Sequence, residues 1–504
     1  MEAHLDTLEA KGLIRLASHR PELEYLFRHW LVQDAAYGSL LKQERRALHR
    51  LVGESLEHLY PDRTDELAPV LAMHFEQAGD ARRAVQYLLA VGRHALDGAA
   101  IREAFSAFDR AAGLLPPVAA GEDAEVRRQR VEIGVGRVRS SWSFRSAEDL
   151  IAELEAIVPA AEEIGDPMLL ASLHLNLALG RMQAGAPATD ANVMRSLDRV
   201  TEIGEALNDP SLRAMPLAIV GLNQVMTGPL RGGVKALEEA IPLMEQRKDV
   251  IGASFARGSL AMGYAELGEF AKAEQAAGEA AELAAGGDLI AQLDAMIAQA
   301  MVRSARGMLD EAAPLAQACL LQSEETGATA CAMVSSWVLG DVLKRQGRLE
   351  ESRDALRRGN DIALIVDRKI WRPTLQAWLG STASALGEQA SASGTWEEAL
   401  GAARAIGNRM GEAGIRWKHA ESAATAGDWA TALGEFEASA AILESEGSRP
   451  MLSRVLRGWG DALREAGRQA EGDEKLRRAL SLFEEMDIAG EADEVRQALA
   501  ATPA

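Results

Sequence analysis

The sequence is poor in aromatic residues, cysteine and basic charge. Aromatic side chains make up 5% of its 504 residues, and Cys319 and Cys331 are its two cysteines. Two cysteines without CxxC spacing cannot build a disulfide framework, so we expect buried thiols in a reducing compartment. No 18-residue stretch is both strongly apolar and free of charge, and the first residues are acidic and amphipathic. We therefore predict a cytoplasmic protein without a signal peptide or a membrane span.

The shortage of basic residues excludes one class of partner. The chain has 54 Lys and Arg against 75 Asp and Glu, a formal net charge of −21. Such a surface repels nucleic acid phosphates and anionic lipids. The densest basic clusters, Arg45-Arg46 and Arg477-Arg478, are interrupted by acidic or apolar residues, as on solvated helix faces. We expect neither a nucleic acid nor a membrane as a partner.

Motifs that carry catalysis are also missing. The sequence has no Gly-Lys dipeptide, so the phosphate-binding loop GxxxxGK[ST] cannot occur, and GxSxG is absent. Most of the 9 histidines lie before residue 100, where a metal cluster is conceivable, but none has HExxH or HxxxH spacing. We interpret His29, His49 and His74 as helix-packing residues. The prediction is a chain without catalytic residues, cofactor or metal, and so not an enzyme.

What the sequence does have is a repeat of 40 residues. Turn glycines recur at Gly307, Gly347, Gly387, Gly427 and Gly467. A second set of turn-forming residues falls halfway between them, at Gly287, Gly327, Asp367, Gly407, Gly447 and Asp487. The intervening segments are rich in Ala, Leu, Glu, Gln and Arg, which favour helices. Each repeat is therefore predicted to be a helical hairpin.

Small residues occupy two columns of this repeat, seven positions before the turn glycine and five positions after it. Two helices approach closely only where Cβ bulk is absent, so the columns predict the contact within each hairpin. The columns are Ala261, Ala300, Gly340, Gly380, Ala420 and Gly460, then Ala273, Ala312, Ser352, Ala392, Ala432 and Gly472.

This spacing resembles the tetratricopeptide repeat, in which an LG pair and a later small residue stand 12 positions apart. Leu339-Gly340 and Leu379-Gly380 match the LG pair. The family's period is about 34 residues, so we expect helices longer by nearly one turn here. The predicted fold is an all-α, tetratricopeptide-like, right-handed superhelical solenoid. A HEAT-like or armadillo-like array is the alternative at this period.

Three regions are predicted along the chain. Residues 1–60 read as a partial winged helix with following helices, because a helix over His4–Lys11 precedes two short strands, Gly12–Leu16 and Leu23–Phe27, joined by a turn. Residues 61–115 hold amino-terminal repeats around the turn at Gly79. After a proline-rich break over Leu115–Gly121, residues 122–504 form the main repeat array.

The run Tyr25–Glu57 resembles the segment that follows the ATPase core in bacterial STAND-type signal-transduction ATPases, some of which are fused to class III adenylate or guanylate cyclases. The likeness extends from about Leu5 to Leu115. It implies that the repeats act as the sensor or scaffold of such a system, whose ATPase and cyclase domains this chain lacks. The alternative is a transcriptional regulator in which the winged-helix remnant contacts DNA. The matching positions are Phe27, His29, Leu31, Val32, Gln33, Ala36, Tyr37, Leu40, Leu41, Arg45, Arg46, His49 and Val52.

A candidate binding face follows from the repeat register. Trp337 and Trp417 each stand ten residues before a turn glycine, a position that faces the concave side of a tetratricopeptide superhelix. Partly exposed aromatic residues beside charges suit a protein or peptide partner in a groove. The alternative is that these tryptophans fill the core between hairpins. The full predicted set is Trp337, Asp341, Lys344, Arg345, Trp417, Glu421, Asp461 and Arg464.

Overall fold

The computed structural model describes residues 2–18, 24–98, 100–117, 122–287, 289–366, 369–388 and 396–500. The chain divides into two compact units. The first unit comprises Met1–His94 with Ser106–Glu122, and the repeat unit comprises Ala95–Phe105 with Asp123–Ala504.

The first unit begins with the predicted helix and hairpin. The two strands are antiparallel, with Ile14 opposite Phe27. The turn expected over Ser18–Glu22 and the second half of the Leu115–Gly121 break lie largely outside the described residues. The winged-helix assignment stays a prediction. The elements are α1 (Glu2–Ala10), β1 (Ile14–Ser18), β2 (Glu24–Phe27), α2 (Trp30–Ser39), α3 (Lys42–Leu59), η1 (Pro61–Arg63), α4 (Ala68–Ala78) and most of α5 (Ala81–Asp97) and α6 (Ile101–Leu114), whose adjoining ends over Ala95–Phe105 belong to the repeat unit.

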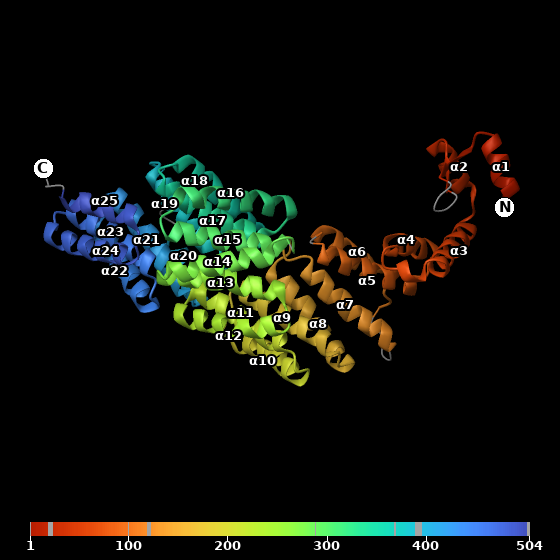
Figure 1. Cartoon of the computed structure of the whole chain (residues 1–504), viewed down its shortest axis with the longest axis horizontal. Coiled ribbons are helices and arrows are strands. Elements are labelled where there is room, and N and C mark those ends of the chain that lie inside the picture. The colour runs from red at the N-terminus through yellow and green to blue at the C-terminus, as the bar shows by residue number, and fades with distance from the viewer. Residues whose placement is uncertain are drawn as a thin grey trace. The chain divides into compact units, whose positions relative to one another are not determined.

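The repeat unit is a succession of antiparallel helical hairpins (Figure 1). From α11 to α13 and from α15 to α18 each helix has 17 or 18 residues, in line with the expected lengthening, whereas α14, α19 and α20 have 15, 14 and 10 residues. Its first helices are α7 (Ala124–Arg139), α8 (Ala147–Ile164), α9 (Pro167–Gln183), α10 (Ala191–Ala206), α11 (Pro210–Thr227), α12 (Leu230–Gln246), α13 (Val250–Leu267), α14 (Phe270–Ala284), α15 (Leu289–Ala305) and α16 (Leu309–Thr326). The later helices are α17 (Thr329–Arg345), α18 (Leu349–Ile365), α19 (Arg372–Ala385), α20 (Trp396–Ala405), α21 (Arg409–Thr425), α22 (Trp429–Glu446), α23 (Arg449–Glu465), α24 (Gln469–Glu485) and α25 (Ala489–Ala500).

Left-handed backbone at the turns explains the glycine periodicity. All five glycines of the first set have φ between +76° and +82°, a region open to glycine because it lacks Cβ. Most of the second set is also left-handed, including Asp487 at φ +57°. One position was wrong: Gly286, with φ +72°, and not Gly287, takes the left-handed conformation. Asp367 lies outside the described residues.

The small columns lie where the helices of a hairpin touch. The Ser352 hydroxyl donates a 2.6 Å hydrogen bond to the Gly340 carbonyl oxygen on the facing helix. A Cβ added at Gly460 would lie 2.7 Å from Leu476 Cγ. Among the glycines of the columns Gly380 has the most room, with 3.3 Å from its Cβ position to Trp396 Cζ2, and Ala392 lies outside the described residues. The columns therefore mark close backbone approach, as predicted.

The repeat unit also curls onto itself. Helix α11 contacts α21, and α13 contacts α23. The Ser448 hydroxyl donates a 2.7 Å hydrogen bond to Glu266, 182 positions away, and Arg454 donates to the Ala305 carbonyl oxygen at 2.7 Å. These contacts enclose much of the inner face as a lumen, which corrects the expectation of one open groove. Among the helices that the structure describes, none is long and apolar enough to cross a membrane.

Candidate functional site

Five of the eight residues predicted from the repeat register line one pocket of about 540 Å³, which we call the mouth pocket. Inner helices α17, α19, α21 and α23 form it together with the start of α25. The predicted residues in its wall are Lys344, Arg345, Trp417, Glu421 and Asp461. Charged residues that we did not predict complete the wall: Lys418, Arg454, Arg457, Glu465 and Glu491.

The other three predicted residues lie elsewhere. Trp337 and Asp341 line a smaller cavity of about 60 Å³, which also borders Arg345 and Glu266 and which we call the link. Arg464 lines neither cavity: its guanidinium donates to Asp473 at 2.8 Å and to the Ala498 carbonyl oxygen at 2.6 Å. Arg464 therefore ties α23 to α24 and α25, and its place on a binding face stays a prediction.

The tryptophans are less exposed than expected. Trp417 is 7% exposed and Trp378 is 2% exposed. The Trp378 ring lies edge-on to Trp337 at a centroid distance of 5.6 Å and to Trp417 at 6.4 Å. The expectation that Trp417 stands partly exposed is wrong, because neighbouring inner helices cover it. Trp337 is half-buried, and its indole N–H is buried without a hydrogen-bond partner in the described part of the chain.

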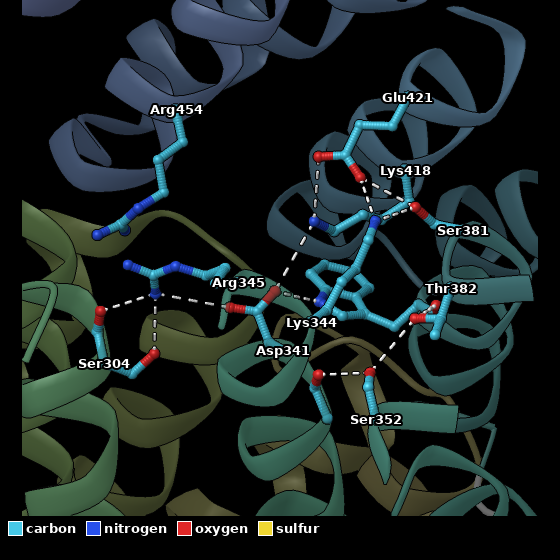
Figure 2. A network of polar contacts seen from close by, with 12 residues as sticks. Ser304, Asp341, Lys344, Arg345, Ser352, Ser381, Thr382, Lys418, Glu421 and Arg454 are labelled. Carbon is cyan, nitrogen blue, oxygen red and sulfur yellow. Dashed lines mark hydrogen bonds and ion pairs between the residues drawn. The ribbon is translucent and has the colours of Figure 1, made fainter. Parts of the chain in front are cut away.

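A buried ion network crosses the floor of the mouth pocket (Figure 2). Lys344 Nζ donates to Glu421 at 2.6 Å, and Lys418 Nζ lies 3.4 Å from Glu421 and 3.7 Å from Asp341. Asp341 also accepts a 2.8 Å hydrogen bond from the Trp378 indole. Burial alone would raise the pKa of Glu421, but the two lysines outweigh it and lower that pKa to about 2. The network therefore stays ionised.

A second part of the network joins distant repeats. Arg454 donates two 2.7 Å hydrogen bonds to Glu491, and Arg345 lies 3.5 Å from the same carboxylate. Arg345 also donates to the Ser304 carbonyl oxygen at 2.8 Å. Burial lowers the pKa of Arg345 to about 10, with repulsion from Arg454 adding to it. The inner faces of α15, α17, α23 and α25 are thus tied together by charge.

Sequence reasoning missed Lys418 and Arg454 for different reasons. Arg454 stands seven residues before Asp461, two helical turns along the same face, so the repeat register could have found it. Lys418 has a side chain only 3% exposed, with Nζ 3.4 Å above the Trp417 ring centroid. A lysine in a helix is normally solvated, so nothing local indicated its burial.

The remaining candidates give no site. In the described ranges, no group of three or more His, Cys, Asp or Glu side chains could hold a metal ion. His49 Nδ1 and His74 Nδ1 lie 2.9 Å apart, where α3 packs on α4. Cys319 and Cys331 are buried free thiols, and burial raises the pKa of both.

No family model matches the sequence, and a search of curated proteins finds no match. Among solved structures, a Rap protein complexed with competence and sporulation factor superposes with a TM-score of 0.51 at 13% identity, over 71% of this chain and 98% of that one. A Rap conjugation gene regulator of the plasmid pLS20, in complex with the Phr* peptide, reaches 0.44 at 13% identity over 81% and 97% of the two chains. A STAND protein with a tetratricopeptide repeat sensor, from Pyrococcus horikoshii, reaches 0.41 at 14% identity over 91% and 75%. The chain has a tetratricopeptide-like helical repeat fold.

Proposed function

We propose that the chain is a peptide-binding regulatory scaffold and that the mouth pocket receives the peptide. The proposal depends on one observation: five of the residues predicted from the repeat register, on three inner helices, line this pocket together. Such a position is where a tetratricopeptide-like superhelix can bind a segment along its axis. The Rap protein of similar fold, solved in complex with competence and sporulation factor, supports a binding role.

Charge at the rim indicates which peptide would bind. Asp461 and Glu465 stand one helical turn apart on α23, and neither forms an ion pair with any residue that the structure describes. Burial raises the pKa of Asp461 and outweighs the opposing effect of Arg457 and Arg464, with which Asp461 forms no ion pair in the described part of the chain. The cations of the pocket are all paired with acids of the chain, namely Lys344, Arg345, Lys418, Arg454 and Arg457. Asp461 and Glu465 are therefore the acids of the pocket wall that a partner can pair with, and a lysine or arginine side chain complements them.

The test selects random heptapeptides displayed on phage for binding to the chain. The selected peptides are then synthesised and their affinity for the chain is measured by titration. We expect the selected peptides to carry lysine or arginine and to bind at least tenfold more weakly to a variant with Asp461→Asn and Glu465→Gln. The control variant carries Glu397→Gln and Glu398→Gln on α20, two exposed acids outside the pocket, and should bind like the parent chain. Selected peptides without basic residues, or equal affinity for all three proteins, would contradict the proposal.

We further propose that the scaffold serves a signal-transduction ATPase or cyclase system. The resemblance of Tyr25–Glu57 to the segment after the ATPase core of STAND-type proteins supports this. Reading the gene upstream of Met1 tests it: an in-frame GxxxxGK[ST] sequence is the expected finding, and an unrelated upstream gene would remove the support.

A further inference from the structure

A third cavity, of about 170 Å³, lies in the lumen of the repeat unit, and we call it the chamber. Helices α9, α11 and α13 line one side, and α19, α21 and α23, much later in the chain, line the other. Its wall contains six methionines, three tryptophans and a phenylalanine, together with a few polar side chains. Both arms of the curled repeat unit therefore surround one apolar space.

The chamber is separated from the mouth pocket. The link shares lining residues with both, and residues of its wall form hydrogen bonds between distant repeats: Ser448 to Glu266, Arg454 to the Ala305 carbonyl oxygen, and Arg345 to the Ser304 carbonyl oxygen. The link, of about 60 Å³, is small for a peptide backbone that extends from the mouth pocket toward the chamber. A small molecule therefore suits the chamber better than the continuation of a bound peptide.

Size and wall chemistry restrict that molecule. An engineered apolar cavity of about 150 Å³ binds benzene, so the chamber has room for one substituted ring. Methionine sulfur atoms make favourable contacts with aromatic rings, and tryptophan rings pack edge-on against them. Met262 and Met301 line the chamber beside Trp337 and Trp378, which are already in edge contact with each other. An aromatic ring suits this wall better than a sugar or an ion.

Glu266 supplies a carboxyl group at the end of the chamber that borders the link. Glu266 borders both the chamber and the link, and its Oε2 accepts a 2.7 Å hydrogen bond from Ser448. Burial raises its pKa, which favours the uncharged carboxyl. Arg345 and Arg454, which line the link together with Glu266, are engaged by Glu491. An ionised ligand would find no free counter-ion here, whereas a hydroxyl group can hydrogen-bond to the Glu266 carboxyl.

We propose that the chamber binds a small neutral aromatic molecule with one hydroxyl group, its ring among the methionine and tryptophan side chains and its hydroxyl on Glu266. The site is distinct from the peptide site at the mouth pocket and does not depend on it. Because both arms of the repeat unit contribute to the wall, the bound molecule holds them together.

The experiment compares two probes of the same size by titration calorimetry with the full chain. p-Cresol carries the hydroxyl, and p-xylene replaces it by a methyl group. We expect saturable binding of p-cresol, at least tenfold tighter than binding of p-xylene. In a Glu266→Met variant this preference should disappear. Absence of saturable p-cresol binding to the parent chain, or an unchanged preference in Glu266→Met, would overturn the proposal.

Substitutions that fill the chamber with a larger side chain test whether p-cresol binds there. Met262→Trp, which adds bulk inside the wall, should abolish p-cresol binding, whereas Met168→Trp on the exposed face of α9 should leave it unchanged. Met226→Trp fills the same space from α11 and replaces Met262→Trp if circular dichroism shows that the latter does not fold. Unchanged p-cresol binding in a folded filled variant refutes the site. Peptides selected at the mouth pocket should bind the filled variant normally, so the two proposals fail separately.

Discussion

Leucine at Gly340 tests the close approach within a hairpin. A Cβ at this position would overlap the side chain of Leu356, which is fully buried, and the Gly340 carbonyl oxygen accepts the 2.6 Å hydrogen bond from Ser352. Overpacking costs about 1–3 kcal/mol, and the upper end applies because even the first added carbon has no room. Leucine favours the helix over glycine by roughly 0.8 kcal/mol. The expected net loss of Gly340→Leu is therefore about 2 kcal/mol.

Gly434 on α22 supplies the matched control. It is also a glycine inside a helix, but nothing lies within 4 Å of its Cβ position. Gly434→Leu should leave stability unchanged or raise it slightly, since only the helix preference acts. Gly380→Leu should fall between the two, because Trp396 Cζ2 lies 3.3 Å from the Cβ position and little has to move for the first carbon.

The assay is urea unfolding followed by circular dichroism at 222 nm, with hydrogen exchange to locate the loss. Gly340→Leu should unfold at lower urea than the parent chain and lose amide protection first in α17 and α18. Equal midpoints for Gly340→Leu and Gly434→Leu would refute the assignment of the small columns to helix contacts.

Three further predictions concern the buried ion network and the tryptophan packed beside it. Lys418→Met should lower the free energy of unfolding by about 3 kcal/mol, because it leaves the buried acids Glu421 and Asp341 with one cation fewer. As a control, Arg348→Met removes the exposed ion pair with Glu351 and should hardly move the urea midpoint. The pKa of Glu421 is about 2 in the folded chain and about 4.3 in the unfolded chain, so the ionised carboxylate stabilises the fold fully above about pH 4.3 and this stabilisation is lost as the pH falls toward 2. Thermal melts from pH 6 to pH 2 should show the loss as a falling melting temperature. The fall should be smaller in Glu421→Gln. Trp417→Ala should cost about 3–5 kcal/mol in urea unfolding, and an unchanged midpoint would mean that the side chain is not part of the core.

The sequence alone determined the repeat and the helices within it. The turns at Gly347 and Gly427 need a positive φ, which glycine adopts without strain. The helix that packs against Gly340 leaves room there only for a small residue. Both requirements arise within one hairpin, so they recur in the sequence with the period of the repeat. The same register brought Lys344, Trp417 and Glu421 to one pocket, since equivalent positions of stacked hairpins share a face.

Only the tertiary structure decided how far the array curls. The contact between Glu266 and Ser448 joins residues 182 positions apart, and its formation depends on small rotations between hairpins that add up over several repeats. The total rotation along the array cannot be predicted from the residues of any one hairpin. The chamber between α11 and α21 follows from this closure, whereas the burial of Lys418 and Trp417 follows from the packing of the neighbouring inner helices α17, α19 and α21. Periodicity therefore predicted the residues of the inner face but not that the face encloses a lumen.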